Sequence, residues 1–371
     1  MTISRSCLRV GGFDRSQETM DDDDVLPYVQ ERLPGFAPTG APVRLAGGTL
    51  NVVWRVPGTE RSLIVKYAPP YIAADPDAPL DPSRLMIEAR CLEALASDGS
   101  LGGIPRSGIR PPRLLDVNEA IPVLLMEDVG DVPSLDDWLR SRVPHVVQEA
   151  VPALGRRLGA FLGRLHARTY GHSGLAEAFN NRPMQETRLV VQYQGVADML
   201  ERGGIVDADT LGKRAEALGE DLLAPNCCLT MGDLWPRSVL VADGELRLID
   251  WELAHYGHPL QDVAHWRAHL WMQRHCAPSS AIAEAVDALR TAFLDAYWTA
   301  LGSAAGALWT EEERRDAAVH FGAEILVRAV GPFQAGYVYA GLDPDHPAVQ
   351  EAVTTAADAL RDPEGAGILD A

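Results

Sequence analysis

Two carboxylates flank a segment whose pattern predicts a β-hairpin. Two short strand-forming runs are joined by Asp243-Gly244, a dipeptide typical of tight hairpin turns. Asp233 lies just before the first run, Asp250 lies just after the second, and Glu252 follows it. Antiparallel pairing would bring these carboxylates to one open end of the hairpin. There, one carboxylate can orient a hydroxyl group while a second holds Mg²⁺, as phosphoryl transfer requires. The alternative is a surface hairpin with ordinary acidic ends.

A lysine earlier in the chain supports the same chemistry. Lys66 lies in the apolar run Leu63–Tyr67, where a buried ammonium group is costly without a partner. Glu88, on the next predicted helix, is the natural partner, and kinases use such a pair to fix nucleotide phosphates. The alternative is an edge-strand lysine that points to solvent. Gly47-Gly48 would let backbone amides approach phosphate oxygens, but such a pair is equally typical of a simple turn.

The elements that must position these residues begin with a β-rich lobe. Strand patterns separated by glycine and proline turns favour one antiparallel sheet of five strands, with one helix inserted in its sequence. The expected strands span 43–46, 50–56, 62–68, 113–117 and 121–126, and the helix spans 83–96. A short helix is also expected after the acidic run Asp21–Asp24, since acidic residues favour the positive end of a helix dipole. Residues 1–20 are expected to form a flexible extension.

Later in the chain the apolar pattern becomes helical. Apolar residues recur at helical spacing over 147–165 and again over 282–301. We therefore predict an α+β fold with two lobes, a nucleotide-binding lobe over 21–130 and a mainly helical lobe over 131–371. The cleft between them is expected near Glu127–Asp131, where the last apolar strand ends.

Composition narrows the class of protein. The chain has 371 residues, of which 47% are hydrophobic, so that it can bury a large core. Its 52 acidic and 33 basic residues give a net charge of −19, which argues against nucleic acid or an anionic membrane as the main partner. The five cysteines lack metal-ligand or disulfide spacing, and no apolar run is long enough for a signal peptide or membrane span. A cytoplasmic enzyme is expected.

The chain resembles the aminoglycoside phosphotransferase and choline kinase group of small-molecule kinases. Within that group it looks most similar to methylthioribose kinases and to fungal kinases of small hydroxylated metabolites. The resemblance covers nearly the whole chain after about residue 40 and is carried by residues 45–55, 63–71, 125–128, 231–252 and 320–331.

The resemblance implies a two-lobed kinase-like fold, ATP and Mg²⁺ as cofactors, and a small hydroxylated substrate. It implies that Asp233 is the catalytic aspartate and contacts the substrate, while Asp250 and Glu252 form the metal-binding pair. The nucleotide site it implies consists of Gly47, Gly48, Asn51, Lys66, Glu88, Glu127, Asp128 and Val129, the last three through their backbone.

Three positions depart from the family pattern. The wider family has His-Gly-Asp where this chain has Met231-Gly232-Asp233, and the missing histidine is mainly a structural support. Ser238 stands where an asparagine usually ligates metal, but methylthioribose kinases similarly have serine, and a hydroxyl still ligates Mg²⁺. Of the paired arginines that hold the sugar in methylthioribose kinases, only Arg328 is present. Arg328 is expected to face the acceptor pocket or to form a salt bridge on a helix surface.

Other conspicuous residues have supporting roles in this interpretation. Trp235 is expected to line the acceptor site, with core packing as the alternative. Asp262 is similar to a family aspartate that supports the catalytic loop, and His166 is expected to be an interior histidine. Cys227-Cys228 is expected to belong to a core strand rather than a zinc site.

Two functional classes follow. The first is an ATP-dependent kinase that phosphorylates a hydroxyl of a small polar metabolite, such as a methylthioribose-like sugar, an aminoglycoside or a hydroxylated amine. The second is a catalytically silent binding protein of the same fold, which Met231 and Ser238 would suit. A protein kinase is a weaker third choice, because the aspartate segment lacks the His-Arg-Asp pattern.

Overall fold

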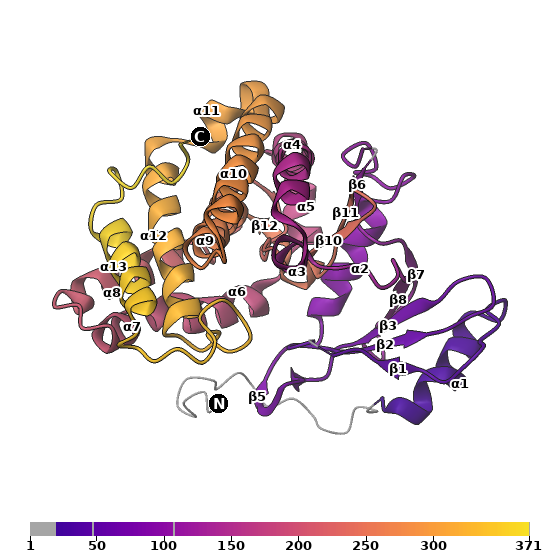
Figure 1. Ribbon diagram of the computed structural model, residues 1–371. Helices are drawn as coiled ribbons and strands as arrows, with labels where there is room; N and C mark the ends of the chain where they lie inside the picture. Colours follow the sequence, from indigo (N-terminus) through magenta and orange to yellow (C-terminus); the bar gives the residue numbers. More distant parts are fainter. Residues whose placement is uncertain (1–19, 47, 107, 371) are drawn as a thin grey trace.

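The structure is a computed structural model that describes residues 20–46, 48–106 and 108–370. Gly47 and nearly all of the predicted N-terminal extension lie outside the described residues. A smaller β-rich lobe and a larger helical lobe lie side by side (Figure 1). This arrangement confirms the predicted two-lobed α+β class.

The N-terminal lobe is built on one antiparallel sheet of five strands. In spatial order the strands are β1 (Val43–Arg44), β2 (Val52–Val56), β3 (Leu63–Tyr67), β8 (Val123–Glu127) and β7 (Leu114–Asn118). Each corresponds to an expected run, although β1, β2 and β3 are shorter than their patterns and β7 and β8 end one residue later. The predicted antiparallel sheet of five strands is therefore confirmed.

A helix covers each face of this sheet. Helix α1 (Asp22–Arg32) begins at a capping box in which the Asp21 side chain accepts from Asp23 N and the Asp24 side chain accepts from Asp21 N. It buries Val25 and Val29 against one face of the sheet. Helix α2 (Arg84–Ala94) packs against the opposite face, together with the large core of the helical lobe. The alternation of side chains along the strands gives each helix its own apolar surface.

Two short pairings were not expected from the sequence. Strands β4 (Tyr71–Ile72) and β5 (Asp75–Pro79) form a separate hairpin after β3. Strand β6 (Ile109–Arg110), although it precedes β7 in the chain, pairs in parallel with a strand of the helical lobe through Ile109↔Leu246 and Arg110↔Arg247. A segment of the first lobe is thus hydrogen-bonded to the second.

The remainder of the chain is mainly helical. Its helices are α3 (Leu135–Ser141), α4 (Pro144–Thr169), α5 (Ser173–Ala178), α6 (Arg182–Arg188), the π-helix η1 (Leu189–Gln194), α7 (Val196–Arg202), α8 (Ala208–Asp221), η2 (Trp251–Leu253), α9 (Leu260–His275), α10 (Ser280–Leu301), η3 (Gly302–Ala304), α11 (Ala305–Leu308), α12 (Glu311–Ala329) and α13 (Pro347–Arg361). Its strands are β9 (Cys228–Thr230), β10 (Val239–Ala242), β11 (Glu245–Leu248) and β12 (His255–Gly257).

The two long predicted helices, α4 and α10, lie side by side through a row of glycines (Figure 1). Gly155, Gly159 and Gly163 recur every four residues on the face of α4 that meets α10. A Cβ at Gly159 would overlap the carbonyl oxygen of Phe293, so only glycine permits this approach. Thr169, the last residue of α4, accepts a hydrogen bond from Leu229 N in β9 over 2.9 Å.

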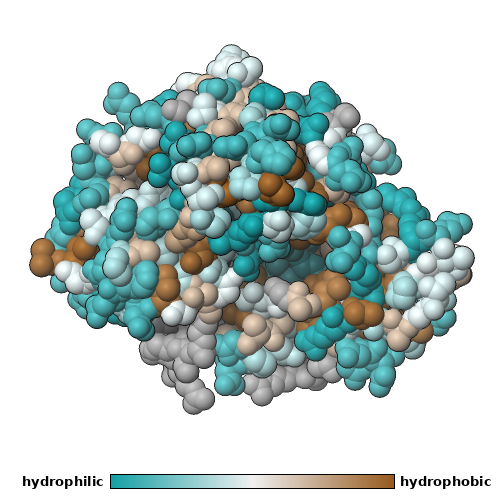
Figure 2. Space-filling view, in the orientation of Figure 1, coloured by the Kyte–Doolittle hydropathy of each residue, from teal (hydrophilic) through white to brown (hydrophobic). Residues whose placement is uncertain are grey.

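The surface has the character expected from the composition. Figure 2 shows a mainly hydrophilic face with scattered apolar residues and a recess near its centre. Among the described residues, we find no helix with both the length and the apolarity that crossing a membrane requires.

Candidate active site

The predicted hairpin is formed by β10 and β11. The strands pair in antiparallel register from Val239↔Leu248 to Ala242↔Glu245. Asp243 and Gly244 both have positive φ angles, 50° and 77°, as a two-residue turn of this kind requires. Asp250 itself adopts a left-handed conformation, with φ 65° and ψ 56°. Such a conformation is uncommon for a residue with a side chain, and it is found disproportionately at functional sites.

Lys66 joins the N-terminal sheet to this hairpin. Its Nζ lies 2.7 Å from Glu88 Oε2, 2.9 Å from Asp250 Oδ1 and 3.6 Å from Glu252 Oε1. The predicted contact with Glu88 is therefore confirmed. Burial alone would lower the pKa of Lys66, but the surrounding carboxylates raise it well above its usual value. The ammonium group therefore stays charged.

Glu252 is enclosed by two further polar side chains. Asn51 Nδ2 lies 2.8 Å from both carboxylate oxygens, and Arg84 Nε donates to Oε2 over 3.0 Å. The Arg84 side chain is fully buried and also donates to Asn51 Oδ1. In the structure, the Asn51 side chain thus donates its hydrogen bonds to the Glu252 carboxylate. Sequence reasoning missed Arg84, although a cation in the first turn of a helix, where it opposes the dipole, was a visible signal.

The residues predicted to contact the nucleotide through their backbone lie at the end of β8, between the lobes. The Glu127 carboxylate accepts from Arg110 at 2.6 and 2.7 Å, and the Asp128 carboxylate pairs with Arg55 at 2.6 Å. Both side chains are thus held by neighbouring arginines, and Glu127 N donates to Arg113 O over 2.9 Å.

The loop before the hairpin is held by Asp262. Its Oδ2 accepts from Met231 N over 2.9 Å, and its Oδ1 accepts from Gly232 N over 2.7 Å. His166 Nε2 lies 3.0 Å from Oδ2, and both His166 and Asp262 are fully buried. The predictions that Asp262 supports this loop and that His166 is interior are confirmed. A buried aspartate and histidine hold the loop although Met231 stands where a histidine was expected.

Ser238 closes the same loop. Its hydroxyl donates to Trp235 O over 2.9 Å and accepts from Trp235 N over 3.2 Å, and the residue is fully buried. These contacts fix the turn that leads from Asp233 into β10. Cys228 lies in the neighbouring core strand β9, as expected, whereas Cys227 precedes this strand and is only half-buried.

Asp233 faces two cationic or polar groups. Its Oδ1 lies 3.3 Å from His265 Nε2 and 3.5 Å from Arg188 Nη2, and 22% of its side chain is exposed. Burial acts to raise the pKa of Asp233, but His265, Arg188 and Arg328 outweigh burial and hold the pKa below its usual range. The carboxylate is therefore ionised and able to accept a hydrogen bond from a hydroxyl group.

A cavity with a volume of about 160 Å³ opens beside Asp233. Its lining comes from the helical lobe and from the N-terminal lobe, including the β4–β5 hairpin and the loop before β2. The lining residues are Thr49, Leu50, Ile72, Pro79, Leu80, Met184, Thr187, Arg188, Val191, Gln192, Asp233, Trp235, Leu253, His265, Glu324, Val327, Arg328 and Phe333. The residues predicted to contact substrate, Trp235 and Arg328, both line it. On the opposite side, Asp250 has a carboxylate that is 42% exposed.

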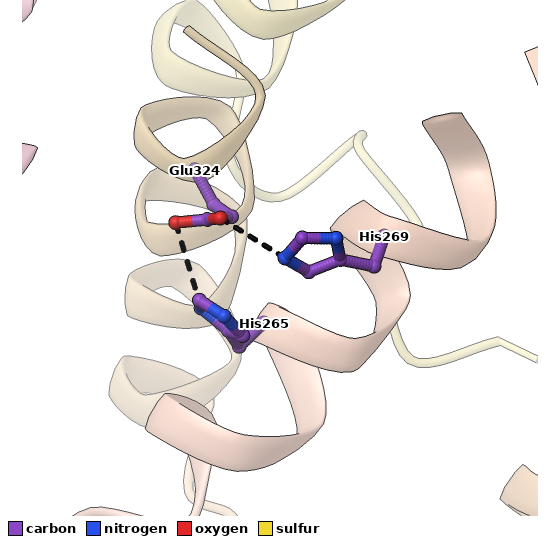
Figure 3. A group of neighbouring side chains, drawn as sticks. All are labelled: His265, His269 and Glu324. Atoms are coloured by element: carbon purple, nitrogen blue, oxygen red, sulfur yellow. Dashed lines mark hydrogen bonds and ion pairs between the residues drawn. The ribbon is translucent and has the colours of Figure 1, made fainter. Parts of the chain in front are cut away.

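A buried network lies behind this cavity (Figure 3). Glu324 on α12 faces α9, where His269 Nε2 lies 3.0 Å from Oε1 and His265 Nδ1 lies 3.6 Å from Oε2. Arg328 donates to the same Oε1 over 2.8 Å, so it forms a salt bridge and lines the cavity at once. Sequence reasoning missed this network, although the spacing of His265 and His269 places both on one helix face.

The network fixes the charge of its members. Burial lowers the pKa of His269 to about 3, against the pull of Glu324. Burial acts to raise the pKa of Glu324, but His265 and the Arg328 guanidinium bring it well below its usual value. The ligand atoms of His265, His269 and Glu324 lie close enough together to hold a metal ion. However, the Arg328 guanidinium beside Glu324 opposes a divalent cation, and hydrogen bonds already occupy Oε1 of the carboxylate.

The site geometry agrees with the comparisons with known proteins. A family model described as the phosphotransferase enzyme family matches residues 43–315. The chain belongs to this family. The match includes the sheet, Lys66, the β10–β11 hairpin and Asp262, which are the elements that build the site. The protein is accordingly a small-molecule phosphotransferase.

The relatives of this phosphotransferase act on different acceptors. A 4-hydroxytryptamine kinase of Psilocybe cyanescens is 28% identical over 260 residues, covering 66% of this chain and 71% of that protein. A methylthioribose kinase of Geobacillus sp. (strain WCH70) is 25% identical over 260 residues, covering 64% of this chain and 62% of that protein. The resemblance to methylthioribose kinases and fungal metabolite kinases is thus confirmed.

A solved structure supports the fold. The spectinomycin phosphotransferase in complex with ADP and spectinomycin superposes with a TM-score of 0.51 and 10% sequence identity. The match covers 92% of this chain and 99% of that one. The kinase-like arrangement of the two lobes therefore extends over almost the whole molecule.

Proposed function

We propose that this phosphotransferase transfers the γ-phosphoryl group of ATP to a hydroxyl group of a small metabolite, with Mg²⁺ as cofactor. One observation carries the proposal. Asp233 and Asp250 lie at the same end of the β10–β11 hairpin, with a lined cavity beside Asp233 and the Lys66–Glu88 ion pair beside Asp250. An acceptor hydroxyl on one side and a nucleotide on the other would then meet at the hairpin.

The nucleotide side has the groups that ATP and Mg²⁺ need. Lys66 would contact phosphate oxygens, helped by Asn51 and by the backbone of the Gly47-Gly48 loop. The exposed carboxylate of Asp250 is the kind of oxygen ligand that Mg²⁺ prefers. We propose Glu252 and Ser238 as the other metal-binding residues. Mg²⁺ would bind them once Glu252 has lost its hydrogen bonds from Asn51 and Ser238 has lost those with the Trp235 backbone. Bound Mg²⁺ would supply positive charge that offsets the charge of the phosphates.

Asp233 would act on the acceptor. Its ionised carboxylate would accept a hydrogen bond from the acceptor hydroxyl, orient it for in-line attack and take its proton. Trp235 and Arg328 would hold the acceptor in the cavity. The cavity volume of about 160 Å³ is below the roughly 300–1,000 Å³ of sites for drug-sized ligands, which favours a small acceptor over a multi-ring aminoglycoside.

The domain boundary belongs to the same proposal. We place it near residue 130, so that residues 21–130 bind the nucleotide and residues 131–371 carry the catalytic loop and the acceptor site. Adenine would contact the backbone of residues 127–129, where the neighbouring side chains are already paired with arginines.

Asp233→Asn gives the first test. The substitution keeps the shape of the side chain but removes its charge, so kcat should fall by roughly 10²-fold or more while the affinity for ATP changes little. Release of ADP is measured with a panel of hydroxylated sugars, acids and amines. Asp243→Asn, at the hairpin turn, is the matched control and should retain activity. A panel in which ATP binds but no acceptor supports turnover would instead favour the silent binding protein.

Asp250→Ala and Lys66→Ala test the nucleotide side. Asp250→Ala should abolish Mg²⁺-dependent ATP turnover and leave the fold intact, because Asp250 lies at a half-exposed position. Lys66→Ala should mainly weaken the binding of Mg·ATP. Calorimetric titration with Mg·ATP, together with circular dichroism for the fold, separates the two effects. Unchanged affinity and turnover in both variants would show that the nucleotide lies elsewhere.

A further inference from the structure

Arg188 presents an unpaired donor inside the molecule. It is the last residue of α6, and its side chain is only 9% exposed. Within the described part of the chain its Nη1 has no hydrogen-bond partner, and Nη2 has only Asp233 Oδ1, 3.5 Å away. A buried guanidinium group is costly to leave without acceptors. The position of Arg188 in the cavity lining indicates that a ligand supplies the missing acceptor.

Gln192 adds a second unsatisfied polar group. It lies in the π-helix η1, which continues directly from α6, and it is only 4% exposed. Its Nε2 also lacks a partner among the described residues, and it lines the same cavity. Single π-helical turns occur frequently at functional sites. Arg188 and Gln192 thus offer two neighbouring donors to whatever fills the cavity.

The remaining walls are mostly apolar. Side chains without polar atoms make up much of the same lining, which favours a ligand with an apolar body. Among them are Leu50, Ile72, Leu253 and Phe333.

The same cavity is poorly suited to an ammonium group. Its two carboxylates are Asp233, which would hold the reacting hydroxyl, and Glu324, which is already bonded to Arg328 and His269. The aromatic rings of the cavity cannot bind an ammonium group either, because a cation already lies over them. The Arg328 guanidinium is 4.6 Å from the centre of the Trp235 ring and 5.3 Å from that of Phe333. The described lining therefore offers an ammonium group no carboxylate that is free of both the reacting hydroxyl and a neighbouring cation.

We propose that the acceptor is a hydroxylated carboxylic acid with an apolar body, and that its carboxylate binds Arg188 and Gln192. The proposal rests on the kinase function proposed above. Arginine binds carboxylates through strong, charge-assisted hydrogen bonds. Because Nη2 of the same guanidinium faces Asp233, a carboxylate on Nη1 lies within a few bonds of the hydroxyl held by Asp233. Lys66, Asp250 and Glu252 do not contribute to the cavity lining, so Arg188 faces the acceptor.

The experiment compares acceptors that differ in one group. Three hydroxyindoles serve as probes: 4-hydroxyindole-3-acetate, its primary amide and 4-hydroxytryptamine, which carry a carboxylate, a neutral amide and an ammonium group. Two smaller hydroxy acids, 3-hydroxybutyrate and 3-phenyllactate, are tested beside their amides. Binding is measured by calorimetry and phosphorylation by ADP release, on wild-type protein, Arg188→Gln, Gln192→Glu and the control Arg182→Gln. Arg182 lies on the same helix, with a side chain that is 49% exposed.

Wild-type protein should bind at least one acid about tenfold or more tightly than its amide, and should bind the amine more weakly still. Arg188→Gln should weaken binding of the acid by about tenfold to a hundredfold, the cost of losing a charged hydrogen bond, and should leave the amide nearly unchanged. Gln192→Glu repels a carboxylate and should shift the preference toward the amine. Arg182→Gln should behave as wild type.

Three results would overturn the proposal. The first is binding of the amine in preference to the acid by wild-type protein. The second is failure of every acid in the series to bind. The third is an equal loss of kcat for acid, amide and amine in Arg188→Gln with unchanged affinities, which would place Arg188 on the transferred phosphoryl group. Arginine-dependent binding of an acid without ADP release would instead contradict the kinase function and leave the carboxylate assignment standing.

Discussion

The charges around Lys66 and those around Asp233 lie on either side of one hairpin, yet they are held differently. Lys66 pairs with Glu88, Asp250 and Glu252, and Arg84 pairs with Glu252, so that two cations hold three carboxylates. Around Asp233, buried donors of Arg188 and Gln192 have no partner among the described residues. A cluster with more carboxylates than cations favours an added cation. Unpaired donors instead favour a ligand that supplies hydrogen-bond acceptors to them.

The largest effect is expected on the ion-paired side. Glu252→Ala leaves the fully buried Arg84 without its carboxylate partner, so the free energy of unfolding should fall by roughly 3–5 kcal/mol. Denaturant titration followed by circular dichroism measures the loss. Glu186→Ala, which breaks an exposed pair with Arg182, should cost less than about 1 kcal/mol. Equal small losses in both variants would show that the cluster contributes little to stability.

A smaller effect on stability, one that depends on pH, is expected in the network of His269 and Glu324 behind the cavity. Burial lowers the pKa of His269 to about 3, so between pH 6.5 and 3 the unfolded chain binds a proton that the folded chain does not. The contribution of His269 is fully present above about pH 6.5 and decreases as the pH falls. His269→Gln keeps hydrogen bonding without titrating, so wild-type protein should lose about 2 kcal/mol more than the variant between pH 7 and 5.

Thermal or denaturant unfolding across this pH range measures the difference. His145→Gln is the control, since His145 is exposed, and it should keep the pH dependence of wild-type protein. Identical pH profiles for wild-type protein and His269→Gln would mean that His269 does not remain neutral in the folded state.

The smallest effect on stability is expected at Ser238, in the loop that leads from Asp233 into β10. Ser238→Ala removes the hydroxyl that bonds the Trp235 backbone, which should cost about 1 kcal/mol of stability. If the hydroxyl also reaches Mg²⁺, as we propose, the Mg²⁺ concentration for half-maximal activity should rise by a few fold. Titration of Mg²⁺ at saturating ATP provides the measurement. An unchanged Mg²⁺ requirement would limit Ser238 to supporting the loop.

Where a local sequence pattern indicates a turn, strand or helix, the prediction also placed the residues of that element correctly. The Asp243-Gly244 turn, the apolar run around Lys66 and the helix that carries Glu88 each have a short-range signal, and strand pairing converts that signal into contacts. The five-stranded sheet follows from the same kind of pattern. The family resemblance added Asn51 and Asp262, whose places in the site no local pattern indicates.

The residues that were missed depend on packing between distant segments. Arg188 and Gln192 enter the cavity because α6 passes into a π-helical turn, which no periodic pattern in the sequence marks. Glu324 meets His265 and His269 only because α12 packs on α9. Strand β6 has two residues, too few for any alternation, and its partner β11 lies far along the chain. Long-range contacts of this kind have no sequence signal of their own.

The pairing of β6 with β11 also bears on how the protein is made. A chain synthesised from its N-terminus exposes Ile109 and Arg110 long before Leu246 and Arg247 leave the ribosome. During that interval a short strand edge of the first lobe stays open, and its backbone groups remain available to other chains. The pairing of β6 is complete only when the β10–β11 hairpin has formed. Synthesis of residues 20–131 alone would therefore yield an unfinished and aggregation-prone piece.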